Sequence, residues 1–373
     1  MGATARGVAK SVALVAGVVF AAACADPSPF RIAVVGSAES QLGALLAAED
    51  INAAGGIGGR LLEVGIVNEH PLAAPQQAIV TADSLAADSR ILAVVGHGTS
   101  GRSLAASQVY NARHVTQIAP TASSPLYSSA GPYSFRMVAS DQHQAEFIAE
   151  RIARSASGLR VAVLYLNNDY GRPLHGFLQR ALRGKRPPPV YDEPFIDGEP
   201  FANSVGEIVR SLAIAAPDLL VWIGGPEELE QLRTPLRSAM PRLRVFGSDA
   251  ASGIGADPAT LTPFVGDWVV AYTDVTADRP ALRSVAARFL PQSGRTLTHG
   301  AALTYDAVGI LAEAMRSGAR DREAIQRFLT GWSASAHVFE GITGPITFDE
   351  HGDARPSYVL MEVTAGGMRR GGR

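Results

Sequence analysis

The sequence has 373 residues, of which 47% are apolar and 18% are charged, and its formal net charge is -2. This balance is typical of a globular chain and excludes an intrinsically disordered one. The length exceeds what a single hydrophobic core usually serves, so two lobes are expected. The near-neutral charge provides no basic surface for nucleic acid, and no nucleic-acid partner is expected.

Residues 1–29 have the layout of an export leader followed by a linker. Arg6 and Lys10 precede an apolar run over 11–24 that is too short to span a bilayer comfortably. The chain's only cysteine, Cys24, ends this run after three alanines and resembles the lipidation site of a bacterial lipoprotein. The alternative is a plain signal peptide with an incidental cysteine. In both cases we expect an extracytoplasmic protein, and lipidation of Cys24 would anchor it to the membrane.

Strand-like apolar runs alternate with helical patterns from residue 30 onward. The expected order is strand 30–37, helix 41–54, strand 61–69, helix 75–88, strand 91–96, helix 103–111 and strand 115–120. Such alternation is typical of βαβ units, in which helices cover both faces of a parallel sheet. A segment rich in Ser, Pro and Gly at 121–137 then interrupts the pattern.

The alternation resumes and predicts a second unit of the same kind. Its elements are helix 141–156, strand 159–167, helix 171–183, strand 190–196, helix 203–215, strand 218–224, helix 227–239 and strand 244–249. Two helices at 298–317 and 321–330 and short strands near 338–348 and 357–364 follow. Because these last elements are too few for a third domain, we expect them to complete the two sheets.

The predicted fold class is therefore α/β, with two doubly wound parallel-sheet lobes and a ligand cleft between them. The first lobe is expected over residues 30–140 and 275–341, and the second over 141–274 and 342–366. Residues 367–373, which include the sequence MRRGGR, are expected to be a disordered tail.

The patterns for nucleotide, metal and hydrolytic sites are weak. The glycine-rich stretch 52–60 follows a helix and precedes a strand, which is the reverse of a phosphate-binding loop. The histidines occur singly, without metal-ligand spacing, so neither a metal nor a cofactor is expected. Ser100 lies in Gly98-Thr99-Ser100-Gly101, one residue short of a hydrolase nucleophile motif, and nearby His97 receives no role. The chain is not expected to be an enzyme; a secreted serine hydrolase stays open as an alternative.

Polar loops follow the predicted strands of both lobes, where open α/β sheets bind their ligands. They lie at 96–103, 120–125, 167–172, 224–228 and 247–252. Hydroxyls of the first two loops could donate to a carboxylate, Asp249 could accept from an ammonium group, and Tyr170 and Trp222 could close over an apolar body. Helix capping is the alternative for each residue. The candidate ligand-binding residues are Gly98, Thr99, Ser100, Thr121, Ala122, Ser123, Tyr170, Trp222 and Asp249.

Several separated stretches are similar to type I periplasmic substrate-binding proteins of the branched-chain amino-acid (leucine/isoleucine/valine-binding) class. They are AAEDINAAGGIGGRLLEV (47–64), AVVGHGTSGRSLAAS (93–107), APTASSP (119–125), VAVLYLNNDYGR (161–172) and GITGPITFDEHGD (341–353). The resemblance covers roughly residues 31–364. It implies two lobes on a multi-strand hinge that close on an amino acid or a related small acid or amide. It also implies a monomer that delivers this ligand to an ABC transporter permease.

Carried over by position, the resemblance assigns roles to the candidate residues. Ser100 and Ser123 would bind the carboxylate of the ligand. The carbonyl of Thr121 and the carboxylate of Asp249 would hold its ammonium group. Tyr170 would be the wall that the second lobe contributes.

Gly98 and Thr99 would line the pocket for the ligand's side chain. Some departures from the family pattern leave the ligand's identity open. The loop at 36–43 is shorter than usual, the segment 67–75 lacks the usual acidic pattern, and Pro226 stands where some members place an aromatic residue. A ligand-sensing module that signals to a membrane receptor would share the fold and the site, but the leader favours transport.

Overall fold

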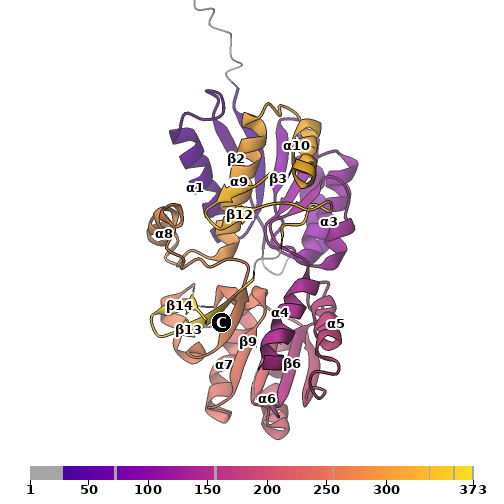
Figure 1. Cartoon of the computed structure of the whole chain (residues 1–373), viewed down its shortest axis with the longest axis vertical. Helices are drawn as coiled ribbons and strands as arrows, with labels where there is room; N and C mark the ends of the chain where they lie inside the picture. The colour runs from indigo at the N-terminus through magenta and orange to yellow at the C-terminus, as the bar shows by residue number, and fades with distance from the viewer. Residues whose placement is uncertain are drawn as a thin grey trace, which may run out of the picture.

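The chain has two lobes stacked along the long axis of the molecule (Figure 1), each built on its own β-sheet. A computed structural model describes residues 28–70, 74–154, 158–254, 256–335, 337–355 and 358–371. The predicted lipidation site, Cys24, lies outside these ranges, as does nearly all of the predicted leader. Within the described ranges, no helix combines the length and the apolar character needed to cross a membrane.

The first lobe is built on a five-stranded parallel sheet in the order β2-β1-β3-β4-β5. Its strands are β1 (Phe30–Gly36), β2 (Leu62–Asn68), β3 (Ile91–Val95), β4 (Thr116–Ala119) and β5 (Ser134–Arg136). One face is covered by α2 (Pro75–Ala87) and α3 (Ser100–Ala112), and the other by α1 (Ala38–Ala53), α9 (His299–Arg316) and α10 (Arg322–Ser335). Because both faces are covered, the inner strands β1 and β3 are apolar almost throughout, as the sequence predicts.

The second lobe has a seven-stranded sheet in the order β14-β13-β10-β9-β8-β6-β7. Strand β13 runs antiparallel to both of its neighbours, β10 and β14, and the other pairs are parallel. Its strands are β6 (Val161–Leu166), β7 (Tyr191–Phe195), β8 (Leu219–Ile223), β9 (Arg244–Gly247), β10 (Trp268–Ala271), β13 (Val359–Thr364) and β14 (Gly367–Arg370). One face packs against α4 (Asp141–Arg154) and α5 (Gly171–Leu182), and the other against α6 (Glu199–Ala215) and α7 (Pro226–Ala239). The predicted pair of doubly wound α/β lobes is confirmed.

In the described ranges the chain crosses between the lobes from β5 to α4, from β10 to α8 (Pro280–Ser293), and again before β13. The hydroxyl of Tyr358, in the last crossing, donates to the carbonyl of Ser140 in the first at 3.2 Å. These crossings form the multi-strand connection that the family resemblance implies. Short 3-10 helices lie at Pro125–Ser129, Asp249–Gly253, Pro258–Thr260 and Thr262–Phe264.

The late strands differ from the prediction that they complete the two sheets. Strands β11 (Phe339–Gly341) and β12 (Gly344–Ile346) pair only with each other, whereas β13 does join the second sheet. Ile346, Phe348 and Ala354 are buried in the core of the first lobe, although residues from 342 were assigned to the second. The ring of Phe348 stacks on Trp332 of α10 at 5.3 Å, which joins this segment to the first lobe.

The prediction that residues 367–373 are a disordered tail is wrong for residues 367–370. Residues Gly367–Arg370 form β14, which pairs with β13 from Thr364↔Gly367 to Met361↔Arg370. Gly367 has a φ of 120°, a conformation that glycine reaches without steric cost and that lets the chain fold back here. Met368 packs against the hydrophobic core of the second lobe. This apolar contact favours an ordered strand, although the Arg- and Gly-rich composition of the segment predicts disorder.

Candidate functional site

Two first-lobe loops meet where β3 and β4 end, at the carboxyl edge of the sheet. Thr99 caps α3, which begins at Ser100 directly after the loop that follows β3. The side chain of Ser100 is buried, and its Oγ accepts a hydrogen bond from the amide of Ser124 at 3.1 Å. The hydroxyl of Thr121 donates to the carbonyl of Gly98 at 3.2 Å. The structure therefore joins the two loops that the sequence singled out.

The second of these loops is tied to the hinge as well as to the first loop. The carbonyl of Ser123 accepts a hydrogen bond from the amide of Asp141, at the start of α4, at 2.8 Å. The side chain of Ser123 is fully buried. The methyl group of Ala122 packs against Tyr127 in a small core, so Ala122 can offer a ligand only its backbone.

The second lobe contributes a hydrogen-bonded group centred on Asp249, directly after β9. Its Oδ1 accepts hydrogen bonds from the hydroxyl of Tyr170 at 2.7 Å and from Nε2 of Gln144 at 2.5 Å. The Tyr170 hydroxyl also lies 2.8 Å from Oγ of Ser248. Asp249 is only 4% exposed, yet the side chains that bond its carboxylate within the described residues are neutral. A buried carboxylate with neutral partners is suited to receive a cationic group.

Asp141 and Gln144 belong to this group but were not predicted. Gln144 accepts from the amide of Asp249 at 2.9 Å and donates to Oδ1 of Asp141 at 3.0 Å. Both side chains are fully buried on a helix face that otherwise carries apolar residues such as Ile148. Two polar residues three positions apart on such a face, just after an interruption of the α/β pattern, were the signal that could have revealed them.

The two aspartates disfavour each other's charge. Burial raises the pKa of Asp249 above its usual value, although hydrogen bonds from Tyr170 and Gln144 lower it in part. Burial also raises the pKa of Asp141 well above its usual value, and the charge of Asp249 raises it further. A cation placed beside Asp249 would relieve this repulsion, because an opposite charge favours the ionised carboxylate.

The structure does not bring Trp222 to this group. Its ring is fully buried in the second core, stacked on Phe195 at 4.5 Å and edge-on to Phe201 at 5.7 Å. Its indole nitrogen donates to the carbonyl of Gly225 at 3.0 Å. Tyr170 belongs to the core on the other face of the sheet. Trp222 therefore lies on the face of β8 that is turned toward α6 and α7.

Replacing Trp222 with alanine is expected to lower the free energy of unfolding by ~3–5 kcal/mol, since it leaves a cavity between two phenylalanines. Ligand affinity is expected to stay near the wild-type value. Urea unfolding and calorimetry check the two quantities separately. Tyr170→Phe is the matched contrast, because it removes one hydrogen bond to Asp249 and should weaken binding with little loss of stability. A large loss of affinity in Trp222→Ala with stability retained would restore Trp222 as a ligand wall.

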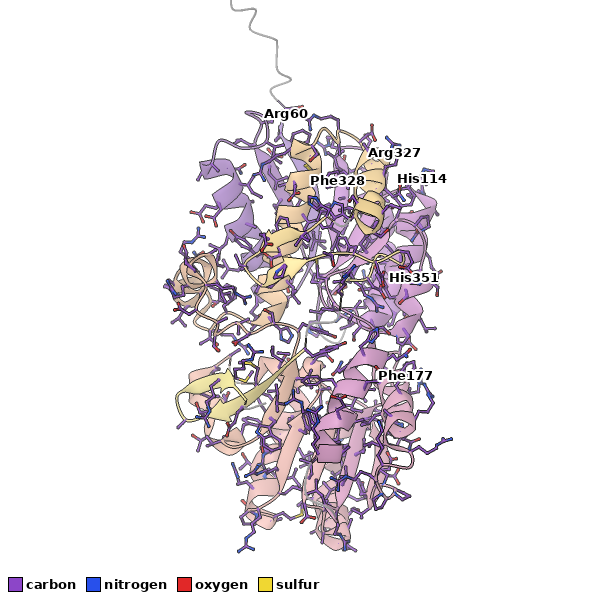
Figure 2. The ribbon with its side chains drawn as sticks, in the orientation of Figure 1. Arg60, His114, Phe177, Arg327, Phe328 and His351 are labelled. Atoms are coloured by element: carbon purple, nitrogen blue, oxygen red, sulfur yellow. The ribbon has the colours of Figure 1, made fainter. Side chains whose placement is uncertain are left out.

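The contacts give no support to a hydrolytic arrangement. The ring of His97 bonds to Glu69 and Tyr110, and none of the described contacts joins it to Ser100. No group of three or more His, Cys, Asp and Glu side chains gathers around a common point in the described part of the chain. Of the single histidines, His114 and His351 are exposed at the surface (Figure 2).

Comparison with known sequences matches the chain to one protein family. A family model described as "Periplasmic binding protein" matches residues 32–368. The Leu/Ile/Val-binding protein homolog 1 of Brucella abortus is 26% identical over 335 residues, which cover 88% of this chain and 86% of that protein.

Solved structures share the fold at lower identity. The branched-chain amino acid transporter substrate binding protein LivJ of Streptococcus pneumoniae, in complex with isoleucine, matches with a TM-score of 0.77 and 22% identity, covering 92% of this chain and 100% of that one. A solute binding protein of an ABC transporter from R. palustris, in complex with benzoate, matches with a TM-score of 0.79 and 16% identity, covering 92% and 96%.

Proposed function

Because the chain belongs to the periplasmic binding protein family, we propose that it captures a small α-amino acid between its lobes and delivers it to an ABC transporter permease. The buried carboxylate of Asp249, bonded by neutral groups and lying across the hinge from the serine-bearing loops, carries this proposal. The name of the Brucella relative and the isoleucine held by the pneumococcal protein favour an aliphatic side chain.

Each lobe supplies one half of the recognition. In the first lobe, Ser100 is the first residue of α3, where a helix N-terminus favours the negative charge of a carboxylate. Ser123 directly precedes Ser124, whose amide bonds to Ser100. In the second lobe, Asp249 binds the ammonium group, and Tyr170 holds Asp249 in place while forming the wall of the site. The carbonyl of Thr121 is a further acceptor for the ammonium group, and Gly98 and Thr99 border the ligand's side chain.

Closure follows from this division, because neither lobe alone surrounds the ligand. The ligand shifts the equilibrium toward the closed form only through contacts made there. Micromolar affinity corresponds to about 8 kcal/mol. A few charge-assisted hydrogen bonds of ~1.5–3 kcal/mol each, with burial of an aliphatic group, supply that amount after the costs of ordering.

We also propose that the protein is a monomeric lipoprotein anchored outside the cytoplasm through Cys24. The support is the apolar run before this cysteine and the periplasmic character of the family. Cys24→Ser is expected to move the protein from the membrane fraction to the soluble fraction of cells. Retention of the variant in the membrane fraction would rule out lipid anchoring at this residue.

A ligand screen tests the amino-acid proposal. Thermal unfolding is measured with each of the common L-amino acids and with benzoate, and calorimetry gives the affinity of each compound that stabilises. We expect leucine, isoleucine or valine to raise the melting temperature, because a ligand of the folded state stabilises it in proportion to RT ln(1 + [L]/Kd). Benzoate lacks an ammonium group and should have no effect. Stabilisation by benzoate and by none of the amino acids would overturn the proposal.

Amino-acid affinity is expected to fall as the pH is lowered from neutral into the mildly acidic range. The ammonium group binds the ionised form of Asp249, whose pKa burial raises above 3.8, so protonation begins before an exposed aspartate would titrate. The ligand-free protein should respond with the opposite sign. Its folded state binds these protons more readily than the unfolded state, so its stability rises as the pH falls through the raised pKa. Calorimetry and urea unfolding over the same pH series check both signs; affinity independent of pH would contradict the role of Asp249.

A further inference from the structure

A buried carboxylate lies next to the first ligand loop without belonging to the site described above. Glu69 follows β2, and its side chain is only 7% exposed. Its Oε2 accepts a hydrogen bond from the amide of Gly98 at 3.0 Å, and its Oε1 lies 2.5 Å from Nδ1 of His97. Nε of Arg102 is 3.4 Å from the same carboxylate. A residue far from the loop in sequence therefore binds the loop's backbone and two of its side chains.

His97, to which the sequence assigned no role, is the fully buried partner of this carboxylate. Its Nε2 lies 3.3 Å from the hydroxyl of Tyr110, so the imidazole bridges Glu69 and α3. The carbonyl of His97 accepts a hydrogen bond from Ser103 Oγ at 3.0 Å. Hydrogen bonds therefore fix both the ring and the backbone of His97.

Arg102 extends the same network to the next residue of the loop. Its Nε donates to Oγ1 of Thr99 at 3.0 Å, and its Nη1 donates to the carbonyl of His70 at 2.6 Å. Burial alone would raise the pKa of Glu69, but hydrogen bonds from His97 and Gly98, with Arg102 nearby, hold that pKa below its usual value. The carboxylate is therefore ionised near neutral pH, where it accepts these bonds most strongly.

We propose that Glu69 is a positioning residue for ligand binding, because its carboxylate holds the loop Gly98–Ser100 in the conformation that receives the ligand. The inference rests on the proposed function of that loop. With the amide of Gly98 bonded to Glu69 and its carbonyl to Thr121, both sides of the peptide backbone at Gly98 are committed. A loop that is ordered before binding loses no further conformational entropy when the ligand binds, and this preorganisation contributes to affinity.

The alternative is that Glu69 only stabilises the lobe, and a matched variant separates the two roles. Asp306 is a buried carboxylate of the first lobe, which accepts from the amides of Ile342 and Thr343 at 2.8 and 2.9 Å. Within the described residues its hydrogen bonds go to the turn between β11 and β12 and to no residue of the ligand loops. Glu69→Ala and Asp306→Ala therefore remove the same kind of group from two places in one lobe.

Hydrogen–deuterium exchange of ligand-free protein is the first measurement, and it does not depend on which ligand binds. In Glu69→Ala, exchange at residues 96–103 is expected to rise about tenfold, since the amide of Gly98 loses its acceptor. Asp306→Ala should leave this segment unchanged while lowering global stability. Glu69→Gln should show a smaller rise, because its amide oxygen can still accept from Gly98.

Calorimetry with L-leucine is the second measurement. Affinity is expected to fall about tenfold in Glu69→Ala, equivalent to about 1.4 kcal/mol, and to stay at the wild-type value in Asp306→Ala. Unchanged exchange at 96–103 in folded Glu69→Ala would overturn the inference; if that variant does not fold, unchanged exchange in Glu69→Gln would do so. Failure of the wild type to bind any amino acid overturns the proposed function instead, and the exchange measurement still decides whether Glu69 orders the loop.

Discussion

Replacing Asp249 with asparagine is expected to weaken amino-acid binding about a hundredfold or more. The substitution keeps the size of the side chain and its contact with Tyr170 but removes the charge that the ammonium group requires. Removing one partner of a buried charge pair commonly costs ~2–5 kcal/mol of binding free energy, which sets this magnitude. Isothermal calorimetry with L-leucine, or with the amino acid that the wild type binds most tightly, measures the loss.

The ligand-free Asp249→Asn protein should be at least as stable as the wild type, because the substitution removes one of two neighbouring buried carboxylates. Asp267→Asn is the control. Asp267 is a buried aspartate of the same lobe that bonds to Nε of Arg233 at 2.6 Å, away from the loops. We expect this control to lose stability and to keep its affinity. Unchanged affinity in Asp249→Asn would remove the ammonium assignment.

Replacing Asp353 with alanine is expected to lower the free energy of unfolding by ~3–5 kcal/mol. Asp353 pairs with Arg136 through two hydrogen bonds, one of 2.6 Å between Nε and Oδ1 and one between Nη2 and Oδ2. The guanidinium is fully buried, so removing the carboxylate leaves an uncompensated charge in the interior. Urea unfolding followed by circular dichroism measures the change.

Arg136 of this ion pair also bonds to the ligand loop at 120–125. Nη1 of Arg136 donates to the carbonyls of Ala122 at 3.2 Å and Ser124 at 2.8 Å. The double variant Arg136→Met with Asp353→Ala should lose less stability than the sum of the single changes, because it leaves neither charge unpaired. A loss below about 1 kcal/mol in Asp353→Ala, the range of an exposed pair, would contradict this account.

Much of the fold could be predicted because the signals that define it are local. Apolar runs such as 30–37 and 91–96 alternate with helical patterns, and covered parallel strands must be apolar on both faces. For the same reason the sequence could not say which way Trp222 points, since a strand buried on both faces carries no alternation to orient its side chains. The sequence does not predict strand β14, because a short strand forms only when it pairs with a neighbouring strand. Without β13, nothing in the sequence MRRGGR favours an extended conformation.

The candidate site was also predictable only where the signal is local. Loops that directly follow strands could be identified from order alone, and the structure brings together Ser100, Thr121, Tyr170 and Asp249 in the two expected groups. Gln144 and Glu69 could not be found in that way. Each acts on a residue in another segment, and no periodicity or spacing connects Gln144 with Asp249, which is 105 positions away.

The sequence by itself determined the two α/β lobes, the edge of each sheet where the polar loops lie, and the family to which these features point. It did so because hydrophobic periodicity and strand–loop order are properties of short segments. Only the tertiary structure decided that Trp222 is a core residue, that Gln144 orients Asp249, and that His97 is the buried partner of Glu69. Those assignments depend on which distant side chains exclude water together, and burial of that kind exists only once the chain has folded.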